Sequence, residues 1–339
     1  MSNAEAVAEF QRLLAPAVDR RRGLLGAGIT QAFRAFSGDG DGLDGVYIDI
    51  YGPGAVMIEY EGRAPAGFDA AAGAQLALEA LRPLGVRAVY HKPFIRDRSR
   101  LGGALPECVT NARPAAGEVL PEFLLVREHD WALEVRLYDG LSTGVFLDQR
   151  ANRRWVADFC AAFHRSSGKP AAVLNTFAYT CAFSVAAGKH ATTTSVDISP
   201  RYLEWGRRNF AHNSIDSSKH FFTKMDTFEF FGFARKKGWK YDLIILDPPS
   251  FASGSKKKGI KPWSSLDHYA RLVGEAAGLL AAGGAVFAST NTQELCRTGR
   301  LEREIAKAVG RPKWIDLPEV DADFANECDR FSARAFHIH

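Results

Sequence analysis

From Val156 onward the chain alternates apolar segments of strand character with helical segments, and this alternation limits the fold more than any other feature. It is typical of a parallel sheet covered by helices on both faces. In such sheets ligands bind beyond the carboxyl ends of the strands. We expect helices from Ala182 and over 200–212, 227–237, 266–282 and 301–309, and strands at 172–177, 193–198, 221–224, 241–246, 284–289, near Trp314 and at 331–338.

The first part of the chain follows a different pattern, with short strands and turns around one helix. Alternating segments predict one hairpin over 45–60 and a second over 123–137, and 71–84 predicts an amphipathic helix between them. We therefore divide the chain into an N-terminal helix (1–27), a small α+β domain (28–138) and an α/β domain (139–339).

Composition excludes several classes of protein. No apolar run approaches the roughly 20 residues that span a bilayer, and the N-terminus lacks a signal-peptide pattern. The five cysteines form no CxxC pair, which argues against disulfides and zinc and favours a reducing cytoplasm. A net charge of +4 permits nucleic-acid binding without requiring it. We expect no membrane and no metal site, and the oligomeric state is left open, a homodimer included.

The segment 241–251, Tyr-Asp-Leu-Ile-Ile-Leu-Asp-Pro-Pro-Ser-Phe, runs from an apolar strand directly into polar and aromatic residues. Prolines have a restricted φ and no N–H, so the carbonyls around them keep fixed directions. Asp247 and the Pro248 carbonyl can accept hydrogen bonds from a planar amine, while Phe251 offers a ring for stacking. The segment predicts a site for an amino-bearing heterocycle, and an Asx-type turn is the alternative interpretation.

Other predicted strands also end in polar residues. The first ends in Asn-Thr-Phe-Ala-Tyr-Thr over 175–180, the second at Asp197, and the third is followed by Asp226. An acid about 20 residues beyond the first strand–helix turn is where a ribose hydroxyl pair is held. Asp226 is suited to an adenine amino group. Either acid can instead cap the helix that follows it.

The second part of the chain resembles class I S-adenosylmethionine-dependent methyltransferases, and more narrowly the RlmI-like group that acts on large-subunit ribosomal RNA. The resemblance implies a Rossmann-like, seven-stranded, mostly parallel sheet, preceded here by a small α+β domain that binds RNA or braces the fold. Members often begin with a further PUA-type domain, for which we expect no room in this chain. The matching motifs are 144–153, 175–184, 195–199, 209–213 and 247–251, and 39–49 resembles the preceding domain of that group.

The resemblance assigns roles to individual residues. Asp247 would lie beside the transferring methyl group, and the proposed catalytic set is Asp247, Pro248, Ser250, Phe251 and Asn291. Arg153 is interpreted as an ordinary surface or ion-pair residue. The residues implied for S-adenosyl-L-methionine are Phe146, Gln149, Arg150, Asn175, Phe177, Tyr179, Thr180, Asp197, Ile198, Asp226 and Asp247.

Two departures from the group affect the expected chemistry. Cys181 replaces a common glycine, which predicts a reshaped loop or weaker cofactor binding. Enzymes that methylate carbon 5 of a pyrimidine need a thiolate nucleophile, and the group has a cysteine after the fifth strand where this chain reads Phe-Ala-Ser-Thr-Asn-Thr over 287–292. Cys296 lies further on, and the hydroxyl of Ser250 is too weak a nucleophile. We therefore expect methyl transfer to a base nitrogen, which positioning and electrostatics can support.

RNA is the expected partner, ribosomal RNA in particular. Lys92 to Arg100 mixes cations with an aromatic ring, and Ser255 to Lys261 is a basic stretch that follows the predicted base pocket. Each is also typical of a solvated loop. Three alternatives stay open: a pyrimidine carbon-5 enzyme with Cys296 as the nucleophile, a non-catalytic RNA-binding protein on the same fold, and a small-molecule methyltransferase.

Overall fold

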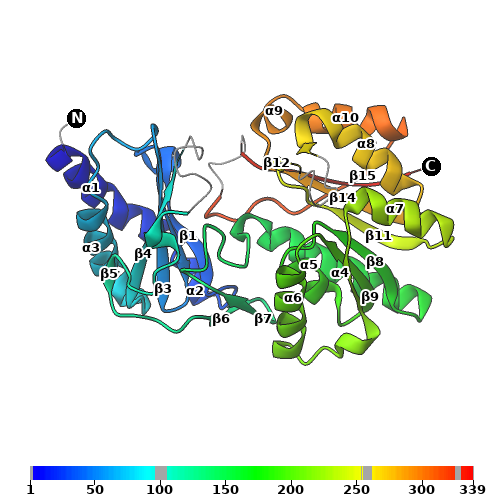
Figure 1. Ribbon diagram of the computed structural model, residues 1–339, viewed down its shortest axis with the longest axis horizontal. Coiled ribbons are helices and arrows are strands. Elements are labelled where there is room, and N and C mark those ends of the chain that lie inside the picture. The colour runs from blue at the N-terminus through cyan, green and yellow to red at the C-terminus, as the bar shows by residue number, and fades with distance from the viewer. Residues whose placement is uncertain (1–2, 96–104, 253, 255–261, 325–329, 339) are drawn as a thin grey trace. The chain divides into compact units, whose positions relative to one another are not determined.

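The computed structural model describes residues 3–95, 105–252, 254, 262–324 and 330–338. Two compact units divide the chain (Figure 1). The first consists of Met1–Leu147 together with Asp321–Asn326, and the second of Asp148–Val320 with Glu327–His339. The first unit therefore contains a short segment from near the end of the chain.

The first unit is built on a five-stranded sheet with the order β1-β2-β3-β4-β5. Neighbouring strands are antiparallel except β3 and β4, which are parallel and joined through helix α3. A separate two-stranded ladder, β6 with β7, forms the second predicted hairpin. The strands are β1 (Ala32–Ser37), β2 (Val46–Tyr51), β3 (Gly54–Tyr60), β4 (Ala88–Phe94), β5 (Ala116–Gly117), β6 (Leu124–Glu128) and β7 (Trp131–Val135).

Helices α1 (Asn3–Arg21) and α3 (Ala70–Leu81) pack together in this unit, and short helical turns follow at α2 (Gly23–Gly26), η1 (Gly38–Asp41), η2 (Arg82–Leu84) and η4 (Glu107–Val109). Asp69 caps α3 because its carboxylate accepts from the backbone N–H groups of Ala71 and Ala72, each at 3.0 Å. The buried side chains of α1, Phe10 among them, belong to the same apolar core as β1, β2 and β3. The N-terminal helix is therefore part of this unit.

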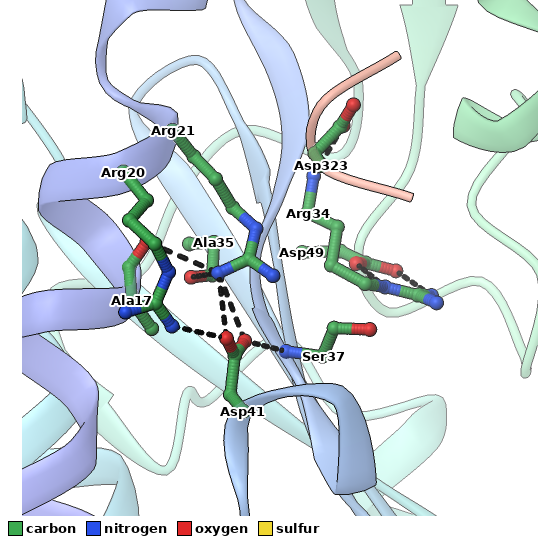
Figure 2. A network of polar contacts seen from close by, with 9 residues as sticks. All are labelled: Ala17, Arg20, Arg21, Arg34, Ala35, Ser37, Asp41, Asp49 and Asp323. Carbon is green, nitrogen blue, oxygen red and sulfur yellow. Dashed lines mark hydrogen bonds and ion pairs between the residues drawn. The ribbon is translucent and has the colours of Figure 1, made fainter. Parts of the chain in front are cut away.

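A buried ionic network joins α1, the turn η1 and the sheet (Figure 2). The Asp41 carboxylate accepts hydrogen bonds from Arg20 at 2.5 Å, from Arg21 and from the backbone N–H of Ser37 at 2.6 Å. Three donors compensate a buried carboxylate for the loss of water. The turn η1 thus also anchors the basic end of α1.

The second unit contains a seven-stranded sheet with the order β10-β9-β8-β11-β14-β16-β15. The five strands from β10 to β14 are parallel, and β16 is antiparallel to both β14 and β15. The predicted seven-stranded, mostly parallel α/β sheet is confirmed. The strands are β8 (Ala171–Thr176), β9 (Ala191–Asp197), β10 (Phe221–Lys224), β11 (Tyr241–Leu246), β14 (Leu280–Thr290), β15 (Lys313–Ile315) and β16 (Ser332–His337), with a small ladder of β12 (Phe251–Ala252) and β13 (Trp263–Ser264) beside them.

Helices cover both faces of this sheet (Figure 1). Alternate residues of β11 enter opposite cores, Leu243 and Ile245 on the side of α4, and Ile244 and Leu246 on the side of α7 and α8. α5 packs with both α4 and α6, and α10 packs with α8. The helices are η5 (Leu147–Gln149), α4 (Arg150–Ser167), α5 (Ala182–Ala187), α6 (Pro200–His212), η6 (Ser217–Lys219), α7 (Thr227–Lys236), α8 (Ser265–Ala277), α9 (Gln293–Cys296) and α10 (Arg300–Val309).

Several elements of the structure were missing from the sequence predictions, and α4 and β4 are the most relevant to the site and the predicted RNA surface. Helix α4 was not expected, although its buried face includes Val156 and Cys160. Strand β4 occupies the start of the segment that we interpreted as an RNA-binding surface. Among the described residues, no helix is both long and apolar enough to cross a membrane.

Candidate active site

The loop after β8 has an unusual backbone. Phe177, Tyr179 and Cys181 all have positive φ, at 53°, 49° and 62°. Left-handed conformations at non-glycine residues cost about 1–3 kcal/mol each and cluster at functional sites. The loop is held to β9 because the Ala178 N–H donates to the Val196 carbonyl at 3.0 Å. The carboxyl end of the first parallel strand is therefore a strained and fixed segment.

Asp197, at the end of β9, supports this loop. Its Oδ2 accepts from the Tyr179 N–H at 2.9 Å, and its Oδ1 accepts from the Ser199 N–H at 2.8 Å. The alternative that Asp197 only caps the next helix is wrong, because Ser199 is the N-cap of α6 and accepts from the Tyr202 N–H. Burial raises the pKa of Asp197, and the two backbone hydrogen bonds oppose that rise.

Cys181 has the backbone conformation that favours glycine, but its side chain has a place of its own. The thiol is fully buried against Gly206 of α6, where a Cβ would overlap the sulfur atom. Burial raises the pKa of this thiol to about 12, so it stays protonated. The thiol thus packs against a glycine of helix α6, and the effect of Cys181 on the loop and on cofactor binding stays a prediction.

The remaining residues predicted for the cofactor differ in what their side chains contact. Asp226 is the N-cap of α7, since its Oδ1 accepts from the N–H groups of Phe228 and Glu229. The Asn175 amide donates to the Ser184 hydroxyl at 2.9 Å, beneath the loop. Thr180 is buried and its carbonyl accepts from Asn209, whereas the Ile198 side chain is 47% exposed.

Asp247, directly after β11, accepts two hydrogen bonds on one oxygen. Its Oδ1 lies 2.9 Å from Gln149 Nε2 and 2.6 Å from the Ser289 hydroxyl, which comes from β14. Burial raises the pKa of Asp247, opposed by these two donors and by the positive charge of Arg153. The structure brings Gln149 and Asp247 into contact and adds Ser289, which the sequence analysis did not select.

The segment after Asp247 is anchored through the Pro249 carbonyl. This oxygen accepts from the Trp263 indole N–H at 2.7 Å and from the Ser265 hydroxyl at 2.8 Å. Pro248 is buried, and 67% of the Phe251 side chain is exposed. The Ser250 hydroxyl donates to Asn291 Oδ1 at 2.5 Å. Four of the predicted catalytic residues thus lie on one short segment, with Asn291 bonded to it from the end of β14.

Trp263 is a further residue that the sequence analysis missed. Its ring lies between those of Phe177 and Phe228, with centroid distances of 5.8 Å to each. A single tryptophan just before a helix shows no sequence pattern by which a site residue could be distinguished from a core residue. The contact with Phe177 connects the strained loop to the segment that follows Asp247.

Two arginines in the first turns of helix α4 are buried. Arg150 and Arg153 are each 1% exposed, so the surface half of the interpretation of Arg153 as a surface or ion-pair residue is wrong, and the ion-pair half stays a prediction. The Arg153 guanidinium lies 6.0 Å from the Phe183 ring and contributes positive charge near Asp247. Phe146 belongs to the first unit, where 49% of its side chain is exposed.

The predicted RNA surface at 92–100 needs a correction at its first residue. Lys92 is 1% exposed in β4, and its ammonium group donates to the Leu141 carbonyl at 3.2 Å. Burial lowers the pKa of Lys92 to about 7, so it is not a surface cation. Residues 96–100 and the basic stretch 255–261 lie outside the described residues.

Cys296 lies at the end of α9, on the wall of a cavity of about 630 Å³ in the second unit. Its thiol donates to the Thr290 carbonyl at 3.5 Å. The same cavity is lined by Asn152, Glu302, Trp314 and Arg334, with Glu302 paired to Arg334. Cys296 thus lies close to Asn291 in the sequence, and it lines the same cavity as Asn152.

The donors and acceptors at these strand ends fit S-adenosylmethionine. Carboxylates follow β9, β10 and β11, and a strained backbone loop follows β8. Asp197 is suited to the ribose hydroxyls, and Asp226 to the adenine amino group through Oδ2, which has no hydrogen-bond partner within the described ranges. A search of the described residues found no cluster of His, Cys, Asp or Glu that could hold a metal ion.

Comparison with known proteins also indicates S-adenosylmethionine as the cofactor. Residues 111–327 match the family model of S-adenosylmethionine-dependent methyltransferases. The chain belongs to this family. SMU.776, named provisionally as a methyltransferase and solved in complex with SAH, has a similar structure with a TM-score of 0.79 and 29% identity, covering 97% of this chain and 80% of that one. The expected family, fold class and cofactor are confirmed.

Two curated relatives show where the sequence similarity lies. YwbD of Bacillus subtilis, named provisionally as a ribosomal RNA large subunit methyltransferase, is 36% identical over 84% of this chain and 66% of its own length. Ribosomal RNA large subunit methyltransferase I of Klebsiella pneumoniae is 34% identical over 73% of this chain and 58% of its own length. The chain thus spans less than two thirds of the length of these relatives.

Proposed function

We propose that this protein transfers a methyl group from S-adenosylmethionine to a base nitrogen of RNA, with large-subunit ribosomal RNA as the substrate. The names of the relatives from Bacillus subtilis and Klebsiella pneumoniae support the choice of RNA. The bound cofactor supplies an activated methyl group on a sulfonium. The protein then has to hold the acceptor base and aim its nitrogen.

One observation carries the choice of nitrogen. The Asp247 carboxylate has both of its described hydrogen bonds on Oδ1. Within the part of the chain that the structure describes, Oδ2 has no hydrogen-bond partner, and it can accept from an N–H of the substrate. The exposed Phe251 ring on the same segment offers a surface on which a base can stack.

Other residues have supporting roles in this proposal. Asp197 would hold the ribose of the cofactor, and Phe177, Tyr179 and Thr180 would line its methionine end. The Ser250–Asn291 hydrogen bond would shape the base pocket between the ends of β11 and β14. Pro248 and the anchored Pro249 carbonyl would keep Asp247 and Phe251 in a fixed relation.

The cofactor site is tested first, by calorimetric titration with S-adenosylmethionine. We expect Asp197→Ala to weaken binding about 10- to 100-fold, the range expected when a hydrogen bond to a charged group is lost. Asp216→Ala is a matched control, because Asp216 is an exposed acid of the same unit that caps the short helix η6. Equal affinity of the Asp197→Ala protein and the wild type would contradict the site.

The reaction is tested with methyl-labelled S-adenosylmethionine and ribosomal RNA that lacks modifications, followed by mass spectrometry of the nucleosides. We expect an N-methylated nucleoside, and loss of the product in Asp247→Ala. Absence of product on any RNA, together with intact cofactor binding, would favour the non-catalytic protein. Methylation of small molecules alone would favour the small-molecule enzyme.

A pyrimidine carbon-5 reaction is the second candidate, because Cys296 lies on a cavity wall directly after the strand that carries Ser289 and Asn291. A carbon-5 enzyme needs Cys296 as its nucleophile. Cys296→Ala would then abolish activity and the product would be a 5-methylpyrimidine. Under the nitrogen proposal the Cys296→Ala protein keeps activity.

A further inference from the structure

The hydrogen bonds around Asp247 all run in one direction. Asn152 Nδ2 donates to Gln149 Oε1 at 2.9 Å, and Gln149 Nε2 donates to Asp247 Oδ1 at 2.9 Å and to the Ser289 hydroxyl oxygen at 3.1 Å. The Ser289 hydroxyl in turn donates to Asp247 Oδ1 at 2.6 Å. Gln149 and Ser289 therefore both donate to Oδ1 of Asp247, and Asn152 donates to Gln149. Hydrogen bonds donated to a carboxylate favour its ionised form.

The residues of this network are buried and come from separate elements. Gln149 is 3% exposed, Asn152 is 4% exposed and Ser289 is fully buried. Gln149 and Asn152 lie at the start of α4, whereas Ser289 lies in β14. Burying uncharged polar side chains is costly unless their hydrogen bonds are made. Three such side chains arranged around one carboxylate indicate that its orientation matters.

The surroundings explain why Asp247 needs these donors. Burial disfavours its charge, while the Arg153 guanidinium of α4 favours it. A further titratable group near Asp247, among the described residues, is Tyr269 of α8, whose hydroxyl donates to the Ser289 carbonyl at 2.7 Å. Burial raises the pKa of Tyr269, so this residue stays neutral and adds no charge of its own. The ionised form of Asp247 is thus stabilised by the positive charge of Arg153 and by hydrogen bonds from two donors, Gln149 and Ser289.

We propose that Gln149 and Ser289 are positioning residues that hold Asp247 as an ionised carboxylate with Oδ2 reserved for the substrate, and that Asn152 orients Gln149. This inference rests on the proposed function and narrows its substrate. A carboxylate accepts hydrogen bonds and donates none. The methyl acceptor must therefore be a nitrogen that carries a hydrogen, such as an exocyclic amine, and not a hydrogen-free ring nitrogen such as guanine N7.

The requirement for a hydrogen follows from the balance of the reaction. The amine nitrogen forms a bond to the methyl carbon as the bond between that carbon and the sulfonium sulfur breaks. The nitrogen then carries a positive charge, and it returns to neutral by losing the N–H proton. Oδ2 of Asp247 is the acceptor that this arrangement leaves for that N–H.

The first experiment measures the titration of Asp247 itself, from the carboxyl ¹³C shift of labelled aspartate in the protein without cofactor or RNA. Asp247→Asn identifies the signal. We expect Ser289→Ala and Gln149→Met each to raise the apparent pKa of Asp247 by about one to two units, because each removes a donor to the charged form. Gln149→Glu should raise it further, since a second carboxylate would face the first.

A matched control separates this effect from a general loss of packing. Thr193→Val removes a fully buried hydroxyl from strand β9, which β8 separates from β11, and this hydroxyl is hydrogen-bonded to His220. Its Asp247 titration should equal that of the wild type. Ser289→Thr keeps a hydroxyl at the network position and should restore the wild-type titration. If Ser289→Ala does not fold, the two Gln149 variants provide the same measurement.

The second experiment compares cofactor binding with the pH dependence of transfer. The acid limb of kcat/KM for RNA should move to higher pH in Ser289→Ala and Gln149→Met, while the Kd for S-adenosylmethionine stays within about threefold of the wild type. A large loss of cofactor affinity in Gln149→Met would instead mean that Gln149 binds the cofactor directly, and would overturn its assignment as a positioning residue.

An unchanged Asp247 titration in both Ser289→Ala and Gln149→Met would overturn the proposal. Detection of a methyl group on a hydrogen-free ring nitrogen would overturn the substrate class. Because the titration needs neither cofactor nor RNA, its outcome is separate from that of the proposed function. A protein that failed to methylate any RNA could still show, or fail to show, the predicted shift.

Discussion

Cys181 and Gly206 pack together, and the Cys181 side chain leaves no space for a side chain at position 206. The thiol occupies the space where a Cβ at position 206 would lie. The backbone of Cys181 is left-handed, a conformation that glycine adopts without strain. The chain therefore combines a cysteine in the loop with a glycine in helix α6.

This pairing predicts coupled stabilities. Gly206→Ala should lower the free energy of unfolding by about 1–3 kcal/mol, because overpacking outweighs the gain of about 1 kcal/mol in helix propensity. In a Cys181→Gly background the same change should cost little or be favourable. Denaturant unfolding of the four proteins measures the coupling. Additive effects would show that the contact between the two residues carries no energy.

Asp247 illustrates a conflict between stability and function at a single residue. Burial raises its folded-state pKa, so between the ordinary pKa of an aspartate and the raised one the folded state binds more protons than the unfolded state. Stability then decreases as pH rises through this window and stays reduced at neutral pH. The ionised form that the proposed reaction uses is the less stable one.

We therefore expect Asp247→Asn to raise the melting temperature at neutral pH while it abolishes methyl transfer. The Asn oxygen can still accept from Gln149 and Ser289, and no charge is buried. The difference from the wild type should shrink as the pH is lowered through the raised pKa, where wild-type Asp247 is neutral too. Thermal unfolding over a pH series measures it. A lower melting temperature at neutral pH would show that the charge is well compensated.

At the scale of elements, the short ladder of β12 and β13 connects the end of one parallel strand to the start of a helix. Two donors, Trp263 in β13 and Ser265 at the start of α8, hold the Pro249 carbonyl. The two prolines restrict the directions that the carbonyls of this segment can take. The donors from β13 and α8 then determine where the Pro249 carbonyl points. The placement of Phe251 and Asp247 is thus a property of two elements together.

Loss of one donor should disturb this arrangement without affecting the cofactor site. We expect Ser265→Ala to lower kcat for RNA methylation about 10- to 100-fold through misplacement of the base, with the Kd for S-adenosylmethionine almost unchanged. Ser218→Ala, at an exposed serine of the short helix η6, is the control. An equal loss of cofactor binding in Ser265→Ala would show that the ladder supports the whole site.

At the scale of the whole molecule, the first unit includes Asp321–Asn326, which is distant in sequence from the rest of that unit. Asp323 is 1% exposed and accepts from the backbone N–H of Arg34 at 3.0 Å (Figure 2). The Arg34 guanidinium pairs with Asp49 and lies between the rings of Tyr47 and Phe324, at 5.0 and 4.8 Å. The chain therefore passes between the two units more than once.

Asp323→Ala should release this segment from strand β1. The change leaves a buried N–H without its acceptor, which costs about 1–3 kcal/mol. Hydrogen exchange should become faster at Arg34 and over Asp321–Phe324, while β8 and β11 of the second unit keep their protection. Asp316→Ala, at an exposed acid in the preceding loop, serves as control. Unchanged exchange at Arg34 would exclude this role of Asp323.

The sequence alone determined the fold class and most of its strands, because alternating apolar periodicity and strand-end residues are local properties of the chain. The strand from Tyr241 to Leu246 and the helix from Pro200 to His212 were predicted with the bounds that the structure shows. Asp247, Ser250 and Asn291 were selected from motifs, and the structure brings them to adjacent strand ends.

Only the tertiary structure decided which side chains are buried and which hydrogen-bond donors contact which acceptors. Lys92 and Arg153 are charged residues whose burial depends on neighbours far away in the sequence. Ser289 and Trp263 are ordinary core residues by pattern. Ser289 became a site residue because parallel strands end at one edge of the sheet, and Trp263 because its indole N–H reaches the Pro249 carbonyl. Pairings such as Cys181 with Gly206 arise from packing, and single-residue patterns carry no information on them.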